Sequence, residues 1–236
     1  STLSLLFFIN NLFPGTPEFQ CMQIHLKKLI PIPLKEQFLQ RNSGIWGKEL
    51  SWNAGEYIKI KAPSGSGKTT LVHLLYKLRI DYEGEIFWGN ENLRNIDAHQ
   101  MALYRQQSVS IIFQDLRLFP NLSARENINL KRVLQKPVYE ENRIEEMAER
   151  LNVLHVLSQP AWKCSYGEQQ RIAIIRALMQ PFSWLIMDEP FSHLDQENIL
   201  KAVALIHEEC VKRKAGFLLT DLEDDDHFPY SIKVDL

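Results

Sequence analysis

The sequence predicts an α/β fold that carries a helical subdomain. Six short runs rich in β-branched and aromatic residues are typical of strands, and helical patterns lie between several of them. From about residue 122 to residue 180 the pattern is mostly helical, and strands return after it. Strands, a helical insertion and strands again indicate one α/β core with a second, helical part.

The individual elements follow from these patterns in chain order. The strand-like runs cover residues 22–29, 57–62, 84–89, 108–115, 184–190 and 216–221. After Lys68, leucines recur at the i, i+3, i+4 and i+7 positions of one helix face, namely Leu71, Leu74, Leu75 and Leu78. Within the helical part, residues 139–154 have a strongly helical pattern.

We expect residues 22–236 to form this domain, with the helical subdomain at about 116–180. Residues 1–21 contain a short apolar patch that Asn, Pro and Gly interrupt and that no basic flank precedes, which argues against a secretory signal. Because Met22 begins the first strand-like run, we expect residues 1–21 to be a leader or an added segment outside the functional fold. A segment that touches a membrane is the alternative.

The composition excludes several classes of protein. The 236 residues are 45% apolar and 24% charged, as in ordinary soluble domains. A net charge of -2 gives no basic footprint for nucleic acid. No apolar run approaches the ~20 residues that span a bilayer. Cys21, Cys164 and Cys210 lie far apart and form no metal-type spacing, so we expect a reducing compartment.

A glycine-rich loop, "APSGSGKTT" at residues 62–70, joins the second strand-like run to the leucine-faced helix. This is the strand–loop–helix context that a phosphate-binding P-loop requires. The glycines let successive backbone N–H groups converge on a phosphate at the positive end of the helix dipole. Lys68 would lie between the β- and γ-phosphates, and the Thr69 hydroxyl would bind Mg²⁺. The residues predicted to bind nucleotide here are Ser64, Gly65, Ser66, Gly67, Lys68, Thr69 and Thr70.

The loop departs from the pattern G-x-x-x-x-G-K-[ST] at its first position, where Ala62 replaces glycine. Alanine is acceptable there if its φ is below zero. We expect this conformation, because the two glycines next to the phosphates, Gly65 and Gly67, are kept.

An apolar strand-like run, "WLIMDEP" at residues 184–190, ends in two acidic residues. At the carboxyl end of a strand, Asp188 is placed to hold Mg²⁺, usually through water. Glu189 can polarise the attacking water as a general base. A surface turn is the alternative for such a pair, and the P-loop favours the catalytic interpretation.

Several motifs occur in an order that resembles the ATP-binding cassette (ABC) ATPases. They are "APSGSGKTT", "FQD" at 113–115, "SYGEQQR" at 165–171, "MDEP" and "SHLD" at 192–195, and the resemblance covers about residues 22–225. It implies a P-loop core with a mixed β-sheet flanked by helices, an antiparallel β part and a helical subdomain. The subgroup that the chain looks most like serves lipoprotein-release, macrolide-efflux and cell-division permeases.

The resemblance also implies roles for residues and cofactors. Gln114 would contact Mg²⁺ and the attacking water, and would couple the site to a transporter's membrane domain. The expected cofactors are ATP and Mg²⁺. The expected catalytic residues are Lys68, Gln114 and Glu189, and the expected metal ligands are Thr69, Gln114 and Asp188.

In this family the signature segment closes over the ATP that a second subunit holds. Ser165 and Gly167 match the serine and the second glycine of that signature. A serine hydroxyl, backbone N–H groups and a helix N-terminus directed at an anion give the contact a physical basis. Asp195 matches the aspartate that passes between the two sites. The resemblance therefore implies a dimer.

Two positions depart from the family pattern. In the signature, Cys164 replaces a leucine and Tyr166 replaces the first glycine, which is awkward if that position needs a positive φ. The family's switch histidine is replaced by Asp221, whose negative charge would repel a γ-phosphate unless Mg²⁺ or a lysine intervened. His193 and His227 are the substitutes to consider, and His227 lies far along the chain from the expected position.

The adenine-stacking aromatic of the family has no clear match, because a proline stands at its position. Phe38 and Trp46 are the nearby candidates.

The leading functional hypothesis is an ATP-hydrolysing subunit of an ABC transporter, whose activity is low if the missing histidine matters. It would form a homodimer or heterodimer at the cytoplasmic face of the membrane, bound to separate permease subunits, with no nucleic-acid partner. The first alternative is a weakly hydrolysing or non-hydrolysing switch subunit that pairs with a more competent ATPase. The second is a soluble ABC ATPase of DNA repair or translation, which typically carries a long coiled coil or two fused cassettes. The transported substrate and the direction of transport belong largely to the permease.

Overall fold

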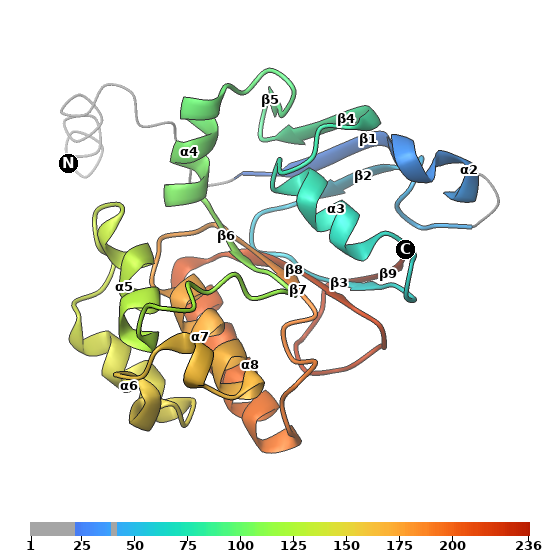
Figure 1. Cartoon of the computed structure of the whole chain (residues 1–236). Coiled ribbons are helices and arrows are strands. Elements are labelled where there is room, and N and C mark those ends of the chain that lie inside the picture. The colour runs from blue at the N-terminus through green and yellow to red at the C-terminus, as the bar shows by residue number, and fades with distance from the viewer. Residues whose placement is uncertain (1–21, 39–41) are drawn as a thin grey trace, which may run out of the picture.

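Two β-sheets organise the chain in the computed structural model, which describes residues 22–38 and 42–236. The predicted α/β core with a helical part is confirmed (Figure 1). The strands are β1 (Ile24–Pro31), β2 (Glu49–Trp52), β3 (Tyr57–Lys61), β4 (Tyr82–Trp88), β5 (Glu91–Asn92), β6 (Val109–Ile112), β7 (Trp184–Asp188), β8 (Gly216–Asp221) and β9 (Ile232–Asp235). The helices are α2 (Lys35–Phe38), α3 (Lys68–Leu75), α4 (Ala98–Gln107), α5 (Ala124–Val133), α6 (Asn142–Arg150), α7 (Tyr166–Leu178) and α8 (Gln196–Arg213). Short 3₁₀ turns cover Ile32–Leu34, Leu154–Val156 and Ala161–Lys163.

The larger sheet has the strand order β6-β7-β8-β3-β9, and its neighbouring strands all run parallel. β7 has the sequence WLIMD and is buried throughout, as expected of a parallel strand that is covered on both faces. In the register of the sheet, Asp188 pairs with Thr220, and Lys61 pairs with Asp221. The carboxyl ends of β3, β7 and β8 therefore meet at one edge, where the glycine-rich loop begins.

The smaller sheet is antiparallel, with the order β2-β1-β4-β5. One hydrophobic cluster joins this sheet and α3 to one face of the parallel sheet. Figure 1 shows α3 lying between the two sheets. The antiparallel pairs are thus gathered in a separate layer, and the sheet that carries the P-loop is parallel.

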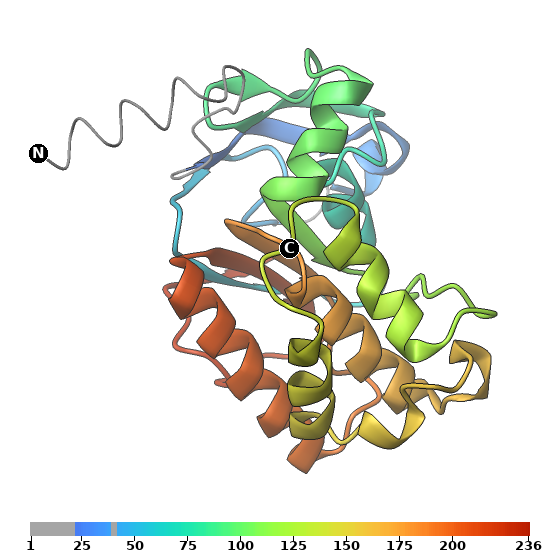
Figure 2. The same cartoon turned by 90° about the vertical axis from the view of Figure 1, so that its left-hand side faces the viewer.

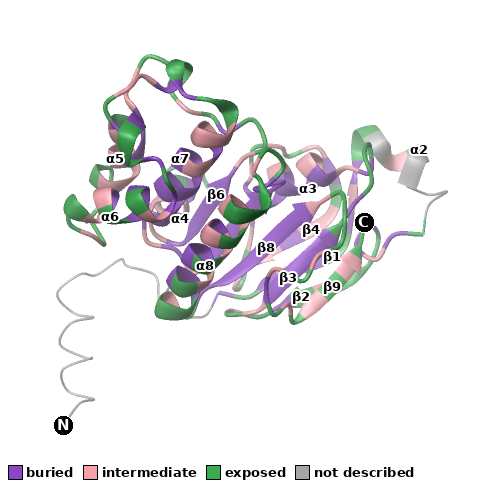
Figure 3. Cartoon of the chain, turned by 90° about the horizontal axis from the view of Figure 1, so that it is seen from below, coloured by how far each residue is buried: buried purple, intermediate pink, exposed green. Residues whose placement is uncertain are grey.

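The helical lobe consists of α5, α6 and α7, which lie beside α8 below the parallel sheet (Figure 2). A second hydrophobic cluster joins these helices to the other face of that sheet. Figure 3 shows the buried residues along the strands and on the inward sides of the helices. Among the residues that the structure describes, no helix combines the length and the apolar character needed to cross a bilayer.

Candidate functional site

The glycine-rich loop follows β3 and ends at the first residue of α3. Gly65 and Gly67 have φ values of 75° and 98°, in the left-handed region where glycine is favoured. Ala62 keeps a negative φ, as its replacement of glycine requires, and it is fully buried. Its N–H donates to the carbonyl of Asp221 at 2.9 Å, so the loop starts from a fixed point on β8.

Lys68 is the first residue of α3, and only 7% of it is exposed. Its ammonium donates to the carbonyl of Ala62 at 3.1 Å and pairs with Glu189 Oε1 at 3.1 Å. The loop thus curls around its own lysine. The ammonium lies where the loop N–H groups and the helix N-terminus also converge, which is the arrangement of an anion site.

Thr69 brings together the residues predicted to bind a metal. Its hydroxyl donates to Asp188 Oδ2 at 2.9 Å and to Gln114 Oε1 at 3.4 Å. Asp188 is 1% exposed, and its other oxygen accepts from the Thr220 hydroxyl at 2.7 Å. A surface cavity of about 330 Å³ opens here, lined by Thr69, His73, Phe113, Gln114, Asp115, Tyr166 and Asp188.

This donor set fits a magnesium ion. A hydroxyl, an amide oxygen and a carboxylate are hard oxygen donors, and Mg²⁺ is usually bound by one or two carboxylates together with substrate phosphates. Such a site needs no cage of protein ligands, and the described residues hold no group of three or more His, Cys, Asp or Glu side chains placed for a metal. Three residues before Thr69, the buried Ser66 hydroxyl has no hydrogen-bond partner within the described residues.

Glu189 follows β7 with a φ of 47°, a strained conformation for a residue other than glycine. Its N–H donates to the Thr220 carbonyl at 2.9 Å, and its own carbonyl accepts from Gln170 at 3.2 Å. These bonds from β8 and α7 fix the strained residue. They hold its carboxylate beside Lys68 at the edge of the P-loop.

Ser165 and Gly167 lie at the N-terminus of α7, on either side of Tyr166, which lines the cavity together with Thr69. Ser165 is the N-cap and shares a capping box with Glu168, whose N–H donates to the serine hydroxyl at 3.3 Å. A side chain on Gly167 would come within 3.1 Å of the His193 carbonyl, so α7 and the "SHLD" turn pack closely. Asp195 caps α8 by accepting from the N–H of Asn198 at 2.8 Å.

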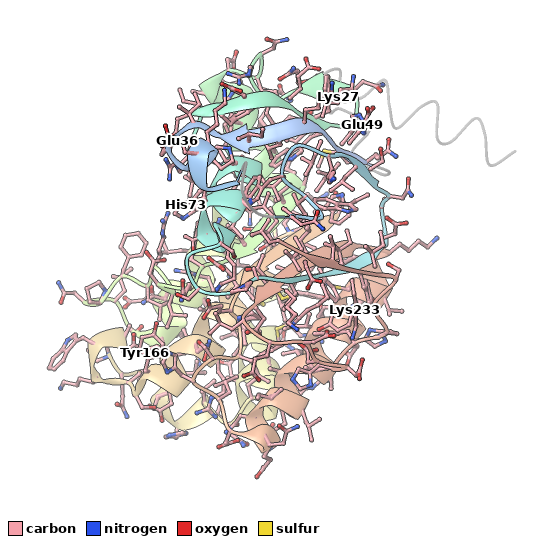
Figure 4. All side chains as sticks on the ribbon, turned by 90° about the vertical axis from the view of Figure 1, so that its right-hand side faces the viewer. Lys27, Glu36, Glu49, His73, Tyr166 and Lys233 are labelled. Atoms are coloured by element: carbon pink, nitrogen blue, oxygen red, sulfur yellow. The ribbon has the colours of Figure 1, made fainter. Side chains whose placement is uncertain are left out.

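Tyr166 begins α7 in a helical conformation, so its replacement of glycine does not require a positive φ. Its hydroxyl donates to the backbone carbonyl of Gln114 at 3.1 Å, and its ring packs edge-on against His193 at 4.3 Å between centroids. Figure 4 shows Tyr166 and His73 on two parts of the molecule, the helical lobe and α3, and both line the same cavity.

Sequence reasoning missed His73 as a residue of this cavity. Thr69 and His73 are four residues apart on α3 and therefore share a face, which is the signal that could have found it. Burial and the nearby charge of Arg117 lower the pKa of His73, so its ring is neutral near pH 7. It adds no charge to the cavity.

The expected repulsion between Asp221 and a γ-phosphate depended on whether Mg²⁺ or a lysine intervenes, and a lysine lies beside Asp221 in the structure. The fully buried Lys59 of β3 lies 3.8 Å from Asp221 Oδ2 and donates a hydrogen bond to Asp225. A second cavity, of about 430 Å³, contains Glu189, Asp221 and His227 in its wall. His227 therefore comes nearer to Glu189 than its place in the sequence suggested.

Of the two candidates for the adenine-stacking aromatic, Trp46 is only 6% exposed. Its indole N–H donates to the carbonyl of Ser66 at 3.3 Å, so a hydrogen bond links the ring to the glycine-rich loop. The side chain of Phe38 lies outside the described part of the structure, as do residues 1–21.

The chain is similar in sequence and in fold to known proteins. Residues 47–192 match the family model described as "ABC transporter". The chain is 34% identical over 166 residues to the "Uncharacterized ABC transporter ATP-binding protein YvcR" of Bacillus subtilis, a match that covers 68% of this chain and 64% of YvcR. It is 34% identical over 172 residues to the "Thiamine import ATP-binding protein ThiQ" of Haemophilus influenzae, covering 72% of this chain and 77% of ThiQ.

Other relatives are much longer than this chain. The "Macrolide export ATP-binding/permease protein MacB" of Bdellovibrio bacteriovorus is 27% identical over 161 residues, which cover 68% of this chain and 25% of MacB. Among solved structures, the dimeric bacterial ABC transporter cassette MJ0796 is similar in fold, with a TM-score of 0.74 and 23% identity, over 90% of this chain and 94% of that one.

Proposed function

This chain belongs to the ABC transporter family, and we propose that it is an ATP-binding and ATP-hydrolysing subunit of a transporter. The observation that carries the proposal is the contact of Lys68 with Glu189 beside the contact of Thr69 with Asp188. These contacts join a phosphate-binding loop, a general base and a metal-binding carboxylate at one sheet edge. The proposed ATPase domain covers residues 22–236, with a helical subdomain at about 116–180.

Each group has a defined task in this proposal. The N–H groups of the loop at Ser64–Thr70 and the ammonium of Lys68 bind the β- and γ-phosphates. Thr69, Gln114 and Asp188 offer the oxygen ligands for Mg²⁺, which would neutralise negative charge on the phosphates. Glu189 accepts a proton from the attacking water. Glu189 pairs with Lys68 in this structure. The phosphate oxygens of ATP must therefore replace Glu189 as the partner of the lysine before the carboxylate can act as a base.

The second half of the site belongs to a partner cassette. A dimer would direct Ser165, Gly167 and Asp195 at the partner's ATP; Ser165 and Asp195 are exposed, and Gly167 is partly buried. The N-terminus of α7 is exposed at Ser165, where it can meet an anion. Homodimer and heterodimer both fit this arrangement.

The permease would dock on the helical lobe next to Gln114. Phe119 and Trp162 are 57% and 60% exposed. The backbone N–H of Trp162 donates to the carbonyl of Pro120 at 3.2 Å, so the two segments adjoin. Two exposed aromatic side chains on adjoining segments are typical of a protein contact. The names of relatives that join ATP-binding and permease parts support a place at the inner face of a membrane. The relatives described above include an importer and an exporter, so we propose the efflux-type subgroup on the sequence resemblance alone.

The test is steady-state phosphate release by the purified chain, with and without its permease, against Glu189→Gln. Loss of the general base should lower kcat by about a hundredfold or more while ATP binding persists. Equal rates for the wild type and Glu189→Gln would contradict the hydrolase proposal. That result would favour a switch subunit that acts by ATP-driven dimerisation, a candidate that the aspartate at position 221 supports.

A further inference from the structure

Lys59 is a charged residue in the middle of strand β3, and its side chain is fully buried. A buried ammonium costs several kcal/mol unless anions and hydrogen bonds compensate it. Its ion-pair partners in the structure, Asp221 and Asp225, both belong to the end of β8 and the acidic turn that follows it. The proposed ATPase chemistry does not use this lysine.

Asp225 is the direct partner of Lys59 and is held from three sides. It accepts hydrogen bonds from Lys59, from the Tyr230 hydroxyl at 2.6 Å and from the N–H of His227 at 2.9 Å. Burial alone would raise the pKa of Asp225, but the bonds from Lys59 and Tyr230 hold it below its usual value. Asp225 is therefore an ionised anchor that ties the turn to β3.

Asp221 is the second carboxylate within reach of the same ammonium. Its Oδ2 lies 3.8 Å from Lys59 Nζ, and its Oδ1 accepts from the N–H of Leu222 at 2.7 Å. The side chain is 27% exposed and shares a cavity wall with Glu189. A carboxylate at this place opposes a nearby γ-phosphate unless a fixed positive charge offsets it.

We propose that Lys59 is a positioning residue that anchors the acidic turn through Asp225 and supplies the counter-charge that allows Asp221 to stand beside the γ-phosphate site. The inference rests on the proposed ATPase function and explains how an aspartate is tolerated at the switch position. The two residues act as a pair: the carboxylate is harmless to ATP binding only while the buried ammonium is present.

The test is a double-mutant cycle that measures the binding of adenylyl-imidodiphosphate with Mg²⁺ by calorimetry. One background is the wild type, and the other is Lys59→Met, which removes the buried ammonium and keeps both of its carboxylate partners. Asp221→Asn is added to each. Lys61→Met removes an exposed lysine from the same strand and serves as the matched control.

In the wild type, Asp221→Asn should not raise the dissociation constant, since it removes a negative charge beside the phosphate site. In the Lys59→Met background the constant should rise roughly tenfold, because the loss of the ammonium adds one net negative charge there. Asp221→Asn should then restore binding to within about twofold of the wild type. ADP lacks the γ-phosphate, so its binding should change far less.

The inference is overturned if Lys59→Met binds as tightly as the wild type, or if the addition of Asp221→Asn to Lys59→Met does not restore binding. Should Lys59→Met fail to fold, Asp225→Asn alone keeps the ammonium, and binding weaker than the wild type by about fivefold or more would contradict the proposal. A wild type that binds no nucleotide overturns the proposed ATPase function, and this inference with it.

Discussion

At the scale of single residues, Tyr166 joins three functional segments. Its hydroxyl donates to the backbone of Gln114, its ring packs on His193, and its own backbone begins α7. The side chain is 45% exposed, so the hydrogen bond competes with water and is worth about 1 kcal/mol. A bond of that size is enough to hold the segment around Gln114 in its present position and slow its movement.

Removal of this bond should release the segment. We expect Tyr166→Phe, which keeps the ring, to raise ATP turnover in the absence of permease by about threefold to fivefold, the factor that ~1 kcal/mol gives. Tyr166→Gly should raise it at least as much. Phosphate release at saturating ATP measures the effect, and Tyr82→Phe in the antiparallel sheet is the control. Unchanged ATP turnover in both variants would show that the replacement of the signature glycine by Tyr166 has no effect on hydrolysis.

Thr69 and Asp188 lie together in the structure, and the sequence motifs indicate this because both residues are predicted to bind one Mg²⁺. The motifs do not predict the contact of Lys68 with Glu189. Lys59 gave no such signal, since its partner Asp225 lies 166 positions away and the pairing depends on the order of strands in the sheet. A lysine between two isoleucines of β3 was the available clue.

At the scale of elements, two helices of the lobe begin with the same chemistry. α5 and α7 each start with a full capping box, Ser123 with Glu126 and Ser165 with Glu168. Each box satisfies orphan N–H groups at a helix N-terminus, so each stabilises its helix to a similar extent. Only the box of α7 also lies in the proposed contact with a partner's ATP.

A comparison of the two capping boxes separates an effect on stability from an effect on ATP turnover. Ser123→Ala and Ser165→Ala should each lower the free energy of unfolding by about 1 kcal/mol, the usual cost of a lost N-cap. We expect ATP turnover to fall by roughly tenfold or more in Ser165→Ala, because a charge-assisted hydrogen bond to the phosphate is lost, and to persist in Ser123→Ala. Urea unfolding and phosphate release measure the two effects. Equal losses of turnover would show that Ser165 acts only on its helix.

The elements that the sequence did not predict are short and partly exposed. β9 has an alternating half-exposed pattern and only four residues, and β2 resembles it. Such strands lack the continuous apolar run that identified β7, and their pairing with distant strands decides their conformation. β6 also ends at Ile112, earlier than expected, which leaves Phe113 and Gln114 in a loop at the cavity.

At the scale of the whole molecule, a buried ion-pair network fastens the helical lobe to α8. Glu209 of α8 is fully buried and accepts from Arg143 of α6 at 2.9 Å and from the Tyr139 hydroxyl at 2.5 Å, and it also pairs with Arg213. Since the lobe carries both α7 and the proposed permease surface, this network sets where those parts lie relative to the P-loop. Its neighbour Glu208 is half-exposed; it pairs with Arg150 at 2.8 Å and also lies 3.6 Å from Arg143.

The network should be visible in the pH dependence of stability. Burial alone would raise the pKa of Glu209, but the hydrogen bond from Tyr139 and the charge of Arg213 lower it overall. A carboxyl whose pKa is lower in the folded chain stabilises the fold above its unfolded pKa of about 4.3, and this stabilisation disappears as the pH falls through the folded value. Glu209→Gln removes that contribution and leaves two arginines without their partner.

We therefore expect Glu209→Gln to lower the free energy of unfolding by about 3 kcal/mol at pH 7, the lower end of the range for breaking a buried pair. Below about pH 4 the difference from the wild type should shrink, because the wild-type carboxyl becomes protonated as well. Glu208→Gln should cost less than about 0.5 kcal/mol at either pH, since its ion pairs are exposed. Urea unfolding of the wild type, Glu209→Gln and Glu208→Gln, at pH 7 and below about pH 4, measures these differences. A loss in Glu209→Gln that stays constant with pH, or a loss as large in Glu208→Gln, would mean that packing rather than the buried charge holds the lobe in place.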